Sequence, residues 1–335
     1  MEEGHAAARV LAGGWVAQGR EVEAFENELC AYLDLPDRHA VAVSSGTAAI
    51  YLALWGLDVH DAAVACPVYA CSALINAIKL AGNRPVFVDT AVDSPNIDPA
   101  EISRSLTDFA IIPHMFGIPI DIAAVRKNGV TVIEDCAQAL GTRHDGTPVG
   151  LGGQVGIFSF YATKIITSGG QGGVLVARDR GIVDAVRDYR EFDRRHDRKP
   201  RFNFQMTDLQ AAIGRAQLRK LPYFIERREE IFARYGETGL NLVDDQGSGR
   251  PVRYRTVVRT EDPRSVIDKL AQHHIKAIVP VEDWELLGPA EQFPHAAALT
   301  RTTVSLPTYP SLSDEELLRI ADVLRDHSHR YRASL

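Results

Sequence analysis

The chain has 335 residues, of which 45% are hydrophobic and 24% are charged, which is typical of a globular protein. A formal net charge of −7 disfavours a nucleic-acid-binding protein, and no apolar run approaches the ~20 residues of a membrane-spanning helix. The acidic start lacks the basic and apolar regions of a signal peptide, and the 4 cysteines form no C-x-x-C pair. We therefore expect a cytoplasmic protein without a metal site, acting on neither nucleic acid nor membranes.

The first two-thirds of the chain alternates short β-rich apolar runs with helical segments. Because several of the apolar runs are almost continuous, they predict a mostly parallel sheet that is covered by helices on both faces. Strands are expected at residues 39–43, 62–66, 85–88, 110–113, 130–133, 156–160 and 174–177, and helices at 47–57, 72–81 and 121–128.

The last third of the chain has a different pattern. It contains a long helical stretch, a polar Gly-rich loop, one strand and two further helices, expected at residues 207–235, 244–250, 252–258, 263–274 and 314–326. This pattern predicts a large α/β/α domain at residues 1–230 and a small C-terminal α+β domain at residues 231–335.

Two motifs follow expected strands directly. The first, Ser44-Ser45-Gly46-Thr47, opens a helix, and a helix N-terminus presents N–H groups and a positive dipole that suit a phosphate. In the second, an apolar strand ends in Glu134 and Asp135, at the edge where open α/β sheets bind ligands. Each motif by itself is more typical of an ordinary helix N-cap.

Two further motifs lie downstream. Lys164 follows an apolar strand and precedes the Gly-rich loop 169–173, which matches no nucleotide-binding pattern. A lysine beside an apolar strand can lose its proton through desolvation and become a nucleophile, although a surface lysine would give the same pattern. The segment 202–212 is an aromatic-rich loop that leads into the long helix.

Together and in this order, the four motifs resemble those of the DegT/StrS-type sugar aminotransferases, which use pyridoxal 5′-phosphate (PLP) on the fold-type-I aminotransferase scaffold. The resemblance extends from Gly13 to Pro310. It implies that Lys164 forms a Schiff base with PLP and moves the substrate proton. It also implies that Asp135 pairs with the protonated pyridine nitrogen.

The resemblance assigns the remaining cofactor contacts as well. Gly46, Thr47 and Ser159 would hold the phosphate, and Gln138 would lie near the phenolic oxygen of the ring. Asn203 would reach the phosphate of the neighbouring subunit's cofactor, so a homodimer with shared active sites is implied.

The chain departs from the family at the position that usually stacks an aromatic side chain on the ring. Cys71 occupies that position here. Tyr69 lies two residues earlier and would share a face with Cys71 if the segment were extended. We therefore expect either Tyr69 to stack on the ring or Cys71 to make a small contact with it.

Substrate contacts are less defined by the sequence. The resemblance places Trp15 over the mouth of the site, and His114 is either an active-site residue or a buried structural histidine. The basic run 193–201, which contains Arg195 and His196, could bind a diphosphate or the carboxylates of glutamate, or be a solvated loop.

The activity implied is transfer of an amino group from L-glutamate to a nucleotide-linked keto-sugar through a pyridoxamine intermediate. A His-Tyr-Pro sequence that many members carry is absent near residues 276–284, which leaves the acceptor open. One alternative keeps the chemistry but uses a keto-cyclitol or another natural-product ketone. The other is a catalytically silent regulatory protein of the same fold.

Overall fold

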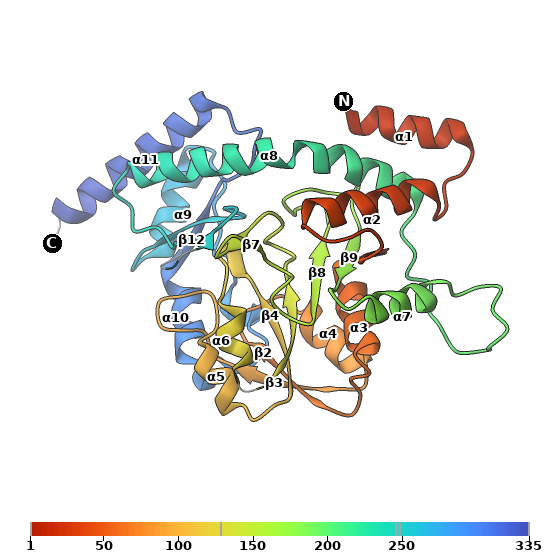
Figure 1. Ribbon diagram of the computed structural model, residues 1–335. Coiled ribbons are helices and arrows are strands. Elements are labelled where there is room, and N and C mark those ends of the chain that lie inside the picture. Colours follow the sequence, from red (N-terminus) through yellow and green to blue (C-terminus); the bar gives the residue numbers. More distant parts are fainter. Residues whose placement is uncertain (1, 128, 245–246, 248, 334–335) are drawn as a thin grey trace.

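The structure, a computed structural model, describes residues 2–127, 129–244, 247 and 249–333. Asn128 of an expected helix, and residues 245, 246 and 248 of the expected loop, lie outside the described residues. Figure 1 shows a central sheet between layers of helices. Its 7 strands are β1 (Ala40–Val43), β2 (Ala63–Pro67), β3 (Arg84–Val88), β4 (Phe109–Pro113), β5 (Thr131–Asp135), β8 (Val155–Ser159) and β9 (Gly173–Val176).

The strand order is β1-β9-β8-β5-β4-β2-β3. Strand β9 is antiparallel to both of its neighbours, and the other pairs in the sheet are parallel. The expectation of a mostly parallel sheet is therefore confirmed. Because parallel strands end at the same edge, the carboxyl ends of β4, β5 and β8 lie together.

Alternate residues along the strands face different helical layers. In β1, Val41 and Val43 pack in one core cluster, and Ala40 and Ala42 pack in another. The first face is covered by α3 (Gly46–Gly56), α4 (Ala73–Leu80) and α7 (Arg180–Arg190). The second is covered by α2 (Arg20–Tyr32), α5 (Pro99–Arg104), α6 (Ile122–Arg126) and α8 (Asp208–Gly236), and α1 (Glu2–Gly13) packs on α8.

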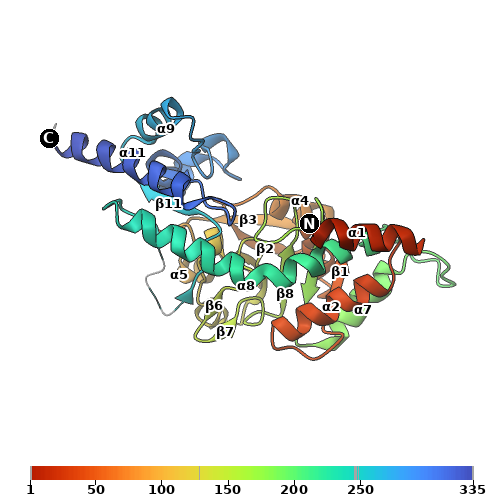
Figure 2. The same cartoon turned by 90° about the horizontal axis from the view of Figure 1, so that it is seen from above.

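Helix α8 connects the sheet to the C-terminal part of the chain (Figure 2). It begins at a capping box formed by Thr207 and Gln210. Leu221 belongs to the core against the sheet, whereas Ile231 belongs to the C-terminal core, and Pro222 lies between them. The C-terminal part contains α9 (Pro263–Gln272), α10 (Pro294–Thr302), α11 (Asp314–Ala333) and the paired strands β11 (Thr256–Arg259) and β12 (Thr303–Leu306). The domain boundary expected at residue 230 falls inside α8 and stays a prediction.

Some element bounds differ from the sequence-based expectation. Strand β11 begins at Thr256 rather than at residue 252, because Arg253 has a φ of 50°, which is incompatible with a strand. A small sheet of β6 (Arg143–His144), β7 (Thr147–Pro148) and β10 (Gly249–Arg250) was not expected. Within the described residues, no helix combines the length and apolarity required to cross a membrane.

Candidate active site

The carboxyl ends of β4, β5 and β8 and the N-terminus of α3 enclose a cavity of about 180 Å³. A crevice at this edge of the sheet is where doubly wound folds bind ligands. Eight of the side chains singled out in the sequence border it: Gly46, Thr47, Cys71, His114, Asp135, Gln138, Ser159 and Lys164.

One end of the cavity is built to bind an anion. The first N–H groups of a helix have no acceptor within the helix, and at α3 the Ser45 side chain accepts only that of Ala48, at 3.1 Å. A Cβ at Gly46 would lie 2.9 Å from the Ser159 Cβ, so glycine is needed for the close approach of α3 to β8. The Ser159 hydroxyl, the free N–H groups and the helix dipole together suit a phosphate.

The cavity also contains a carboxylate with few partners. Asp135 is the last residue of β5, and its Oδ1 accepts one hydrogen bond, from the Ala137 N–H at 2.9 Å. Burial raises the pKa of Asp135, although this N–H and the charge of Lys164 oppose the rise. A cationic group placed opposite Asp135 would offset the cost of burying its charge.

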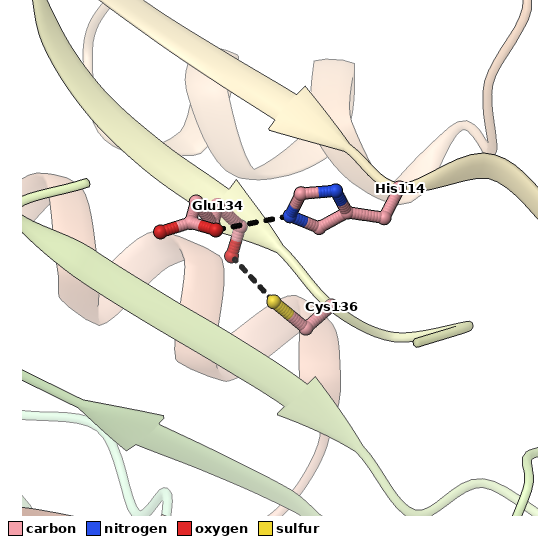
Figure 3. A group of neighbouring side chains, drawn as sticks. All are labelled: His114, Glu134 and Cys136. Atoms are coloured by element: carbon pink, nitrogen blue, oxygen red, sulfur yellow. Dashed lines mark hydrogen bonds and ion pairs between the residues drawn. The ribbon is translucent and has the colours of Figure 1, made fainter. Parts of the chain in front are cut away.

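The preceding residue, Glu134, points to the other face of the sheet, where it joins His114 and Cys136 (Figure 3). Its carboxylate accepts hydrogen bonds from His114 Nε2 at 3.0 Å, from the Gly150 N–H at 2.8 Å and from the Gly153 N–H at 2.6 Å. Burial opposes ionisation of Glu134, but these hydrogen bonds outweigh it and lower the pKa of the carboxyl group.

The tautomer of His114 follows from its partners. Its Nδ1 accepts the Ile120 N–H at 3.1 Å, so the ring proton is at Nε2 and is donated to Glu134. His114, Glu134 and Cys136 have the composition of a metal site. However, both ring nitrogens and both carboxylate oxygens are already hydrogen-bonded, so the cluster ties the loop around Gly150 to β5. His114 is among the residues that border the cavity, but its side chain is fully buried and both ring nitrogens are hydrogen-bonded within the chain, so no ring nitrogen is free for the expected substrate contact.

Lys164 lies where this cavity meets a larger cleft of about 940 Å³. The cleft is bordered by α8, by the segment that leads into β11 and by the segment after β12. The Lys164 Nζ is 5.5 Å from the centroid of the Tyr254 ring. Gln138 accepts the Phe116 N–H through Oε1 at 2.8 Å, and its amide NH₂ donates one hydrogen to Met115 Sδ at 4.0 Å, which leaves the second hydrogen as a donor in the cavity.

The structure also decides between Cys71 and Tyr69 as neighbours of the cavity. Cys71 is exposed and borders it. Tyr69 is fully buried and packs edge-to-face on Phe116, with the ring centroids 6.2 Å apart. Tyr69 does not border the cavity, because residues 68–70 form a bend after β2 rather than an extended segment, and its contact with the cofactor ring stays a prediction.

Besides Tyr69, four predicted residues lie outside both cavities of their own chain. Trp15 is 64% exposed, and its Nε1 donates to the Gln18 carbonyl oxygen. Arg195 pairs with Asp188, and His196 is exposed in the same loop, so the expected contacts of these three residues with the substrate are not made within one chain. Asn203 is also exposed, and its Oδ1 accepts the Gln205 N–H.

The residues of the larger cleft that were not singled out in the sequence include Arg228, Tyr254 and Arg255. Arg228 lies in a long amphipathic helix. Tyr254 and Arg255 belong to an Arg-Tyr-Arg sequence before a strand. Neither pattern distinguishes a binding residue from a surface residue. Only the packing of the C-terminal part against the sheet brings them toward Lys164.

Comparison with known proteins places this geometry in a family. The DegT/DnrJ/EryC1/StrS aminotransferase family matches residues 1–325. The chain is 32% identical to dTDP-3-amino-3,4,6-trideoxy-alpha-D-glucose transaminase of Streptomyces venezuelae, covering 97% of the chain and 92% of that protein. It is 29% identical to GDP-perosamine synthase of Escherichia coli O157:H7, covering 93% and 92%.

The similarity extends to the fold. The crystal structure of S. venezuelae DesV in complex with a ketimine intermediate superposes with a TM-score of 0.90 at 31% identity, covering 97% of this chain and 94% of that one. The match over nearly the whole chain agrees with a cavity that has a helix N-terminus at one end and a lysine at its mouth. The chain therefore belongs to the DegT/DnrJ/EryC1/StrS aminotransferase family, whose members are PLP-dependent enzymes.

Proposed function

We propose that this sugar aminotransferase moves the amino group of L-glutamate to a ketone of a nucleotide-linked sugar, with Lys164 as the residue that binds PLP covalently. One observation carries the proposal. A single cavity has a phosphate-binding end at α3 and β8, a poorly solvated carboxylate at Asp135, and Lys164 at its opening.

The residues present fit PLP. Its phosphate matches the α3 N-terminus and Ser159, and its pyridinium nitrogen matches Asp135, whose pKa is raised by burial without such a cation. The amide NH₂ of Gln138 would donate to the phenolic oxygen, and Cys71 would lie beside the ring. When bound, PLP supplies an electron sink that stabilises negative charge on the reacting carbon of the substrate.

Each side chain has a distinct task in this proposal. Asp135 keeps the ring nitrogen protonated, because an ionised carboxylate favours a cation beside it. Lys164 Nζ would take the proton from the reacting carbon of the amino donor and pass it to C4′ of the cofactor. In the other half-reaction it would move a proton in the opposite direction, from C4′ to the carbon of the acceptor ketone. Burial of this part of the sheet excludes water, which strengthens both interactions.

The larger cleft supports a nucleotide-linked acceptor. Its side chains include the cations Lys164, Arg228, Arg255, Lys276 and Arg319 and the single carboxylate Glu316. In a chain whose net charge is −7, such a concentration of cations favours an anionic substrate. A diphosphate fits it, whereas a neutral keto-cyclitol would not use these charges, and a silent protein would need neither them nor Lys164.

Assembly and location are part of the proposal. Asn203, Arg195 and His196 border neither of the two cavities described above, and this supports their use in a homodimer, where Asn203 would bind the partner's phosphate. The 4 cysteines are all free, which supports a reducing compartment such as the cytoplasm.

Titration of the PLP-loaded protein with L-glutamate tests the proposal. We expect the absorbance of the lysine-bound cofactor to fall while one equivalent of 2-oxoglutarate is released per site. Lys164→Ala is the matched control and should show neither change. If the wild-type protein binds PLP but converts neither L-glutamate nor L-glutamine, the proposed donor is wrong. If it binds no PLP, the assignment of the cavity is wrong.

A further inference from the structure

Two arginines of the large cleft, Arg228 and Arg255, are at least partly buried and lack an acidic partner within the part of the chain that the structure describes; a third, Arg319, also lacks one there but is exposed. Other buried arginines in this chain are paired: Arg190 with Glu26, and Arg253 with Glu229 and Asp244. Among the described residues, no carboxylate lies within ion-pair distance of Arg228 or Arg255, although both border the cleft. A cation that is partly or fully removed from water is normally matched by an anion, so these two indicate a missing one.

Arg228 is held almost entirely by carbonyl groups. It is 5% exposed, and its Nη1 donates to the carbonyl oxygens of Arg253 at 3.2 Å, Tyr254 at 3.1 Å and Thr308 at 2.8 Å. Its Nε is buried without a partner. Burial lowers the pKa of Arg228 to about 10, which leaves it charged at neutral pH. Arg228 therefore fixes the segment before β11 to the segment after β12 and adds an unneutralised charge to the cleft.

Arg255 is the more accessible of the two. Its Nη1 donates to Ser305 Oγ at 3.0 Å, which orients the guanidinium. Its Cζ is 5.6 Å from the centroid of the Tyr254 ring, and Lys164 Nζ is 5.5 Å from the same centroid. The two cations therefore border one aromatic ring, and both line the same cleft. An oxyanion held by Arg255 would belong to a molecule whose other end can reach Lys164.

We propose that Arg255 is a substrate-binding residue that takes an oxyanion of the molecule reacting at Lys164, and that Arg228 is the positioning residue that holds the Tyr254–Arg255 segment in place. The inference rests on the proposed function. The chemistry recognised is a planar pair of oxygens, which a guanidinium binds with two parallel hydrogen bonds. Two groups could supply this pair of oxygens: a carboxylate of the amino donor, or the diphosphate of the acceptor.

Equilibrium binding separates the two sources without turnover. We would titrate the PLP-loaded wild-type protein and its Arg255→Gln variant with glutarate, a dicarboxylate without an amino group, and with UDP. Loss of a charge-assisted hydrogen-bond pair should weaken binding of at least one probe roughly 10- to 100-fold. Arg255→Lys should recover part of the lost affinity, because lysine keeps the positive charge but cannot make two parallel hydrogen bonds. Arg264→Gln, an exposed arginine outside the cleft, should change neither.

The pattern of losses identifies the ligand. Weaker glutarate binding alone supports the carboxylate, weaker UDP binding alone supports the diphosphate, and weakening of both supports one subsite used in both half-reactions. Unchanged binding of both probes to Arg255→Gln, or binding of neither to the wild-type protein, overturns the inference. If Arg255 governs probe binding but L-glutamate is not converted, the proposed function fails and the anion site stands.

Arg228 is tested through Arg255. Arg228→Lys should weaken the same probe, and the double variant with Arg255→Gln should be no weaker than Arg255→Gln alone, because the positioning acts through Arg255. Cofactor absorbance and the thermal unfolding midpoint report whether each variant keeps its fold. Additive losses in a folded double variant would show that Arg228 does not act through Arg255.

Discussion

Two adjacent carboxylates at the end of β5 have opposite environments. Glu134 faces α6 and accepts three hydrogen bonds from the chain itself, and its pKa is lowered. Asp135 faces α3 and accepts one, and its pKa is raised by burial. Structural and functional acids therefore differ in how many hydrogen-bond partners the chain itself gives them. A buried carboxylate whose partners are all internal maintains the fold, whereas one left without enough partners is placed for a ligand.

In the cavity that contains Asp135, Lys164→Ala should have the largest effect on turnover. Without the amine, no covalent link to PLP forms and no group moves the substrate proton, so turnover should fall by about 10⁴-fold or more. The absorbance of the lysine-bound cofactor should disappear while the thermal unfolding midpoint stays close to the wild-type value. A variant that turns over at the wild-type rate would remove Lys164 from the mechanism.

Glu134→Ala tests the structural side. It leaves His114 and the Gly150 and Gly153 N–H groups without their acceptor, so we expect a loss of about 3–5 kcal/mol in the free energy of unfolding. Because the pKa of Glu134 is lowered in the fold, its contribution is present above the ordinary pKa of glutamate and is lost as the pH falls through the lowered value. Urea unfolding of the wild-type protein and of Glu134→Ala between pH 3 and pH 7 measures the loss of unfolding free energy and its dependence on pH. Glu134→Gln, measured beside them, is the control that keeps the size of the side chain. A pH-independent difference would contradict this assignment.

Asp135→Asn should separate stability from activity. A raised pKa means that the ionised form is disfavoured in the fold, so Asp135 costs the apoprotein stability increasingly as the pH rises through that pKa. The variant should therefore unfold at a higher temperature than the wild-type apoprotein near pH 8, with a smaller difference near pH 4. Its turnover should fall roughly 100-fold, because a neutral amide stabilises the pyridinium less well. Equal activity would show that the ring nitrogen needs no anion here.

The smallest effect concerns the cofactor ring. Cys71 is the exposed cysteine, whereas Cys30, Cys66 and Cys136 are buried and burial raises the pKa of each thiol. We expect one thiol of the apoprotein to react readily with a disulfide reagent, and PLP to slow that reaction. Cys71→Phe should tighten PLP binding up to about tenfold through stacking. If Tyr69→Phe alters PLP affinity and Cys71→Phe does not, the placement of these two residues around the ring is reversed.

The sequence was sufficient to predict the cavity because its residues are local to strand and helix ends. Gly46, Asp135, Ser159 and Lys164 each follow or end a strand, and parallel strands bring such positions to one edge. The position of Tyr69 outside the cavity could not be predicted, since it lies in a bend after β2 that no local sequence signal marks.

Residues contributed by distant segments were not predictable from the sequence either. Arg228 and Arg255 meet only through the packing of α8 against the segments next to β11 and β12. Trp15, Arg195 and His196 were expected near the substrate by resemblance, and nothing in their own chain brings them to it. The antiparallel direction of β9 was not expected either, because the apolar pattern of a strand does not determine its direction in the sheet.

The proline inside helix α8 affects how the width of the cleft can change. Pro222 lacks a backbone N–H and interrupts the hydrogen bonding of the helix between Leu221, in the core of the sheet, and Ile231, in the C-terminal core. Bending α8 at Pro222 therefore breaks no further backbone hydrogen bond and needs less free energy than bending it elsewhere. Bending there would widen or narrow the cleft around Arg255, while the cavity of Asp135 and Ser159, built from the N-terminal segments alone, would keep its dimensions.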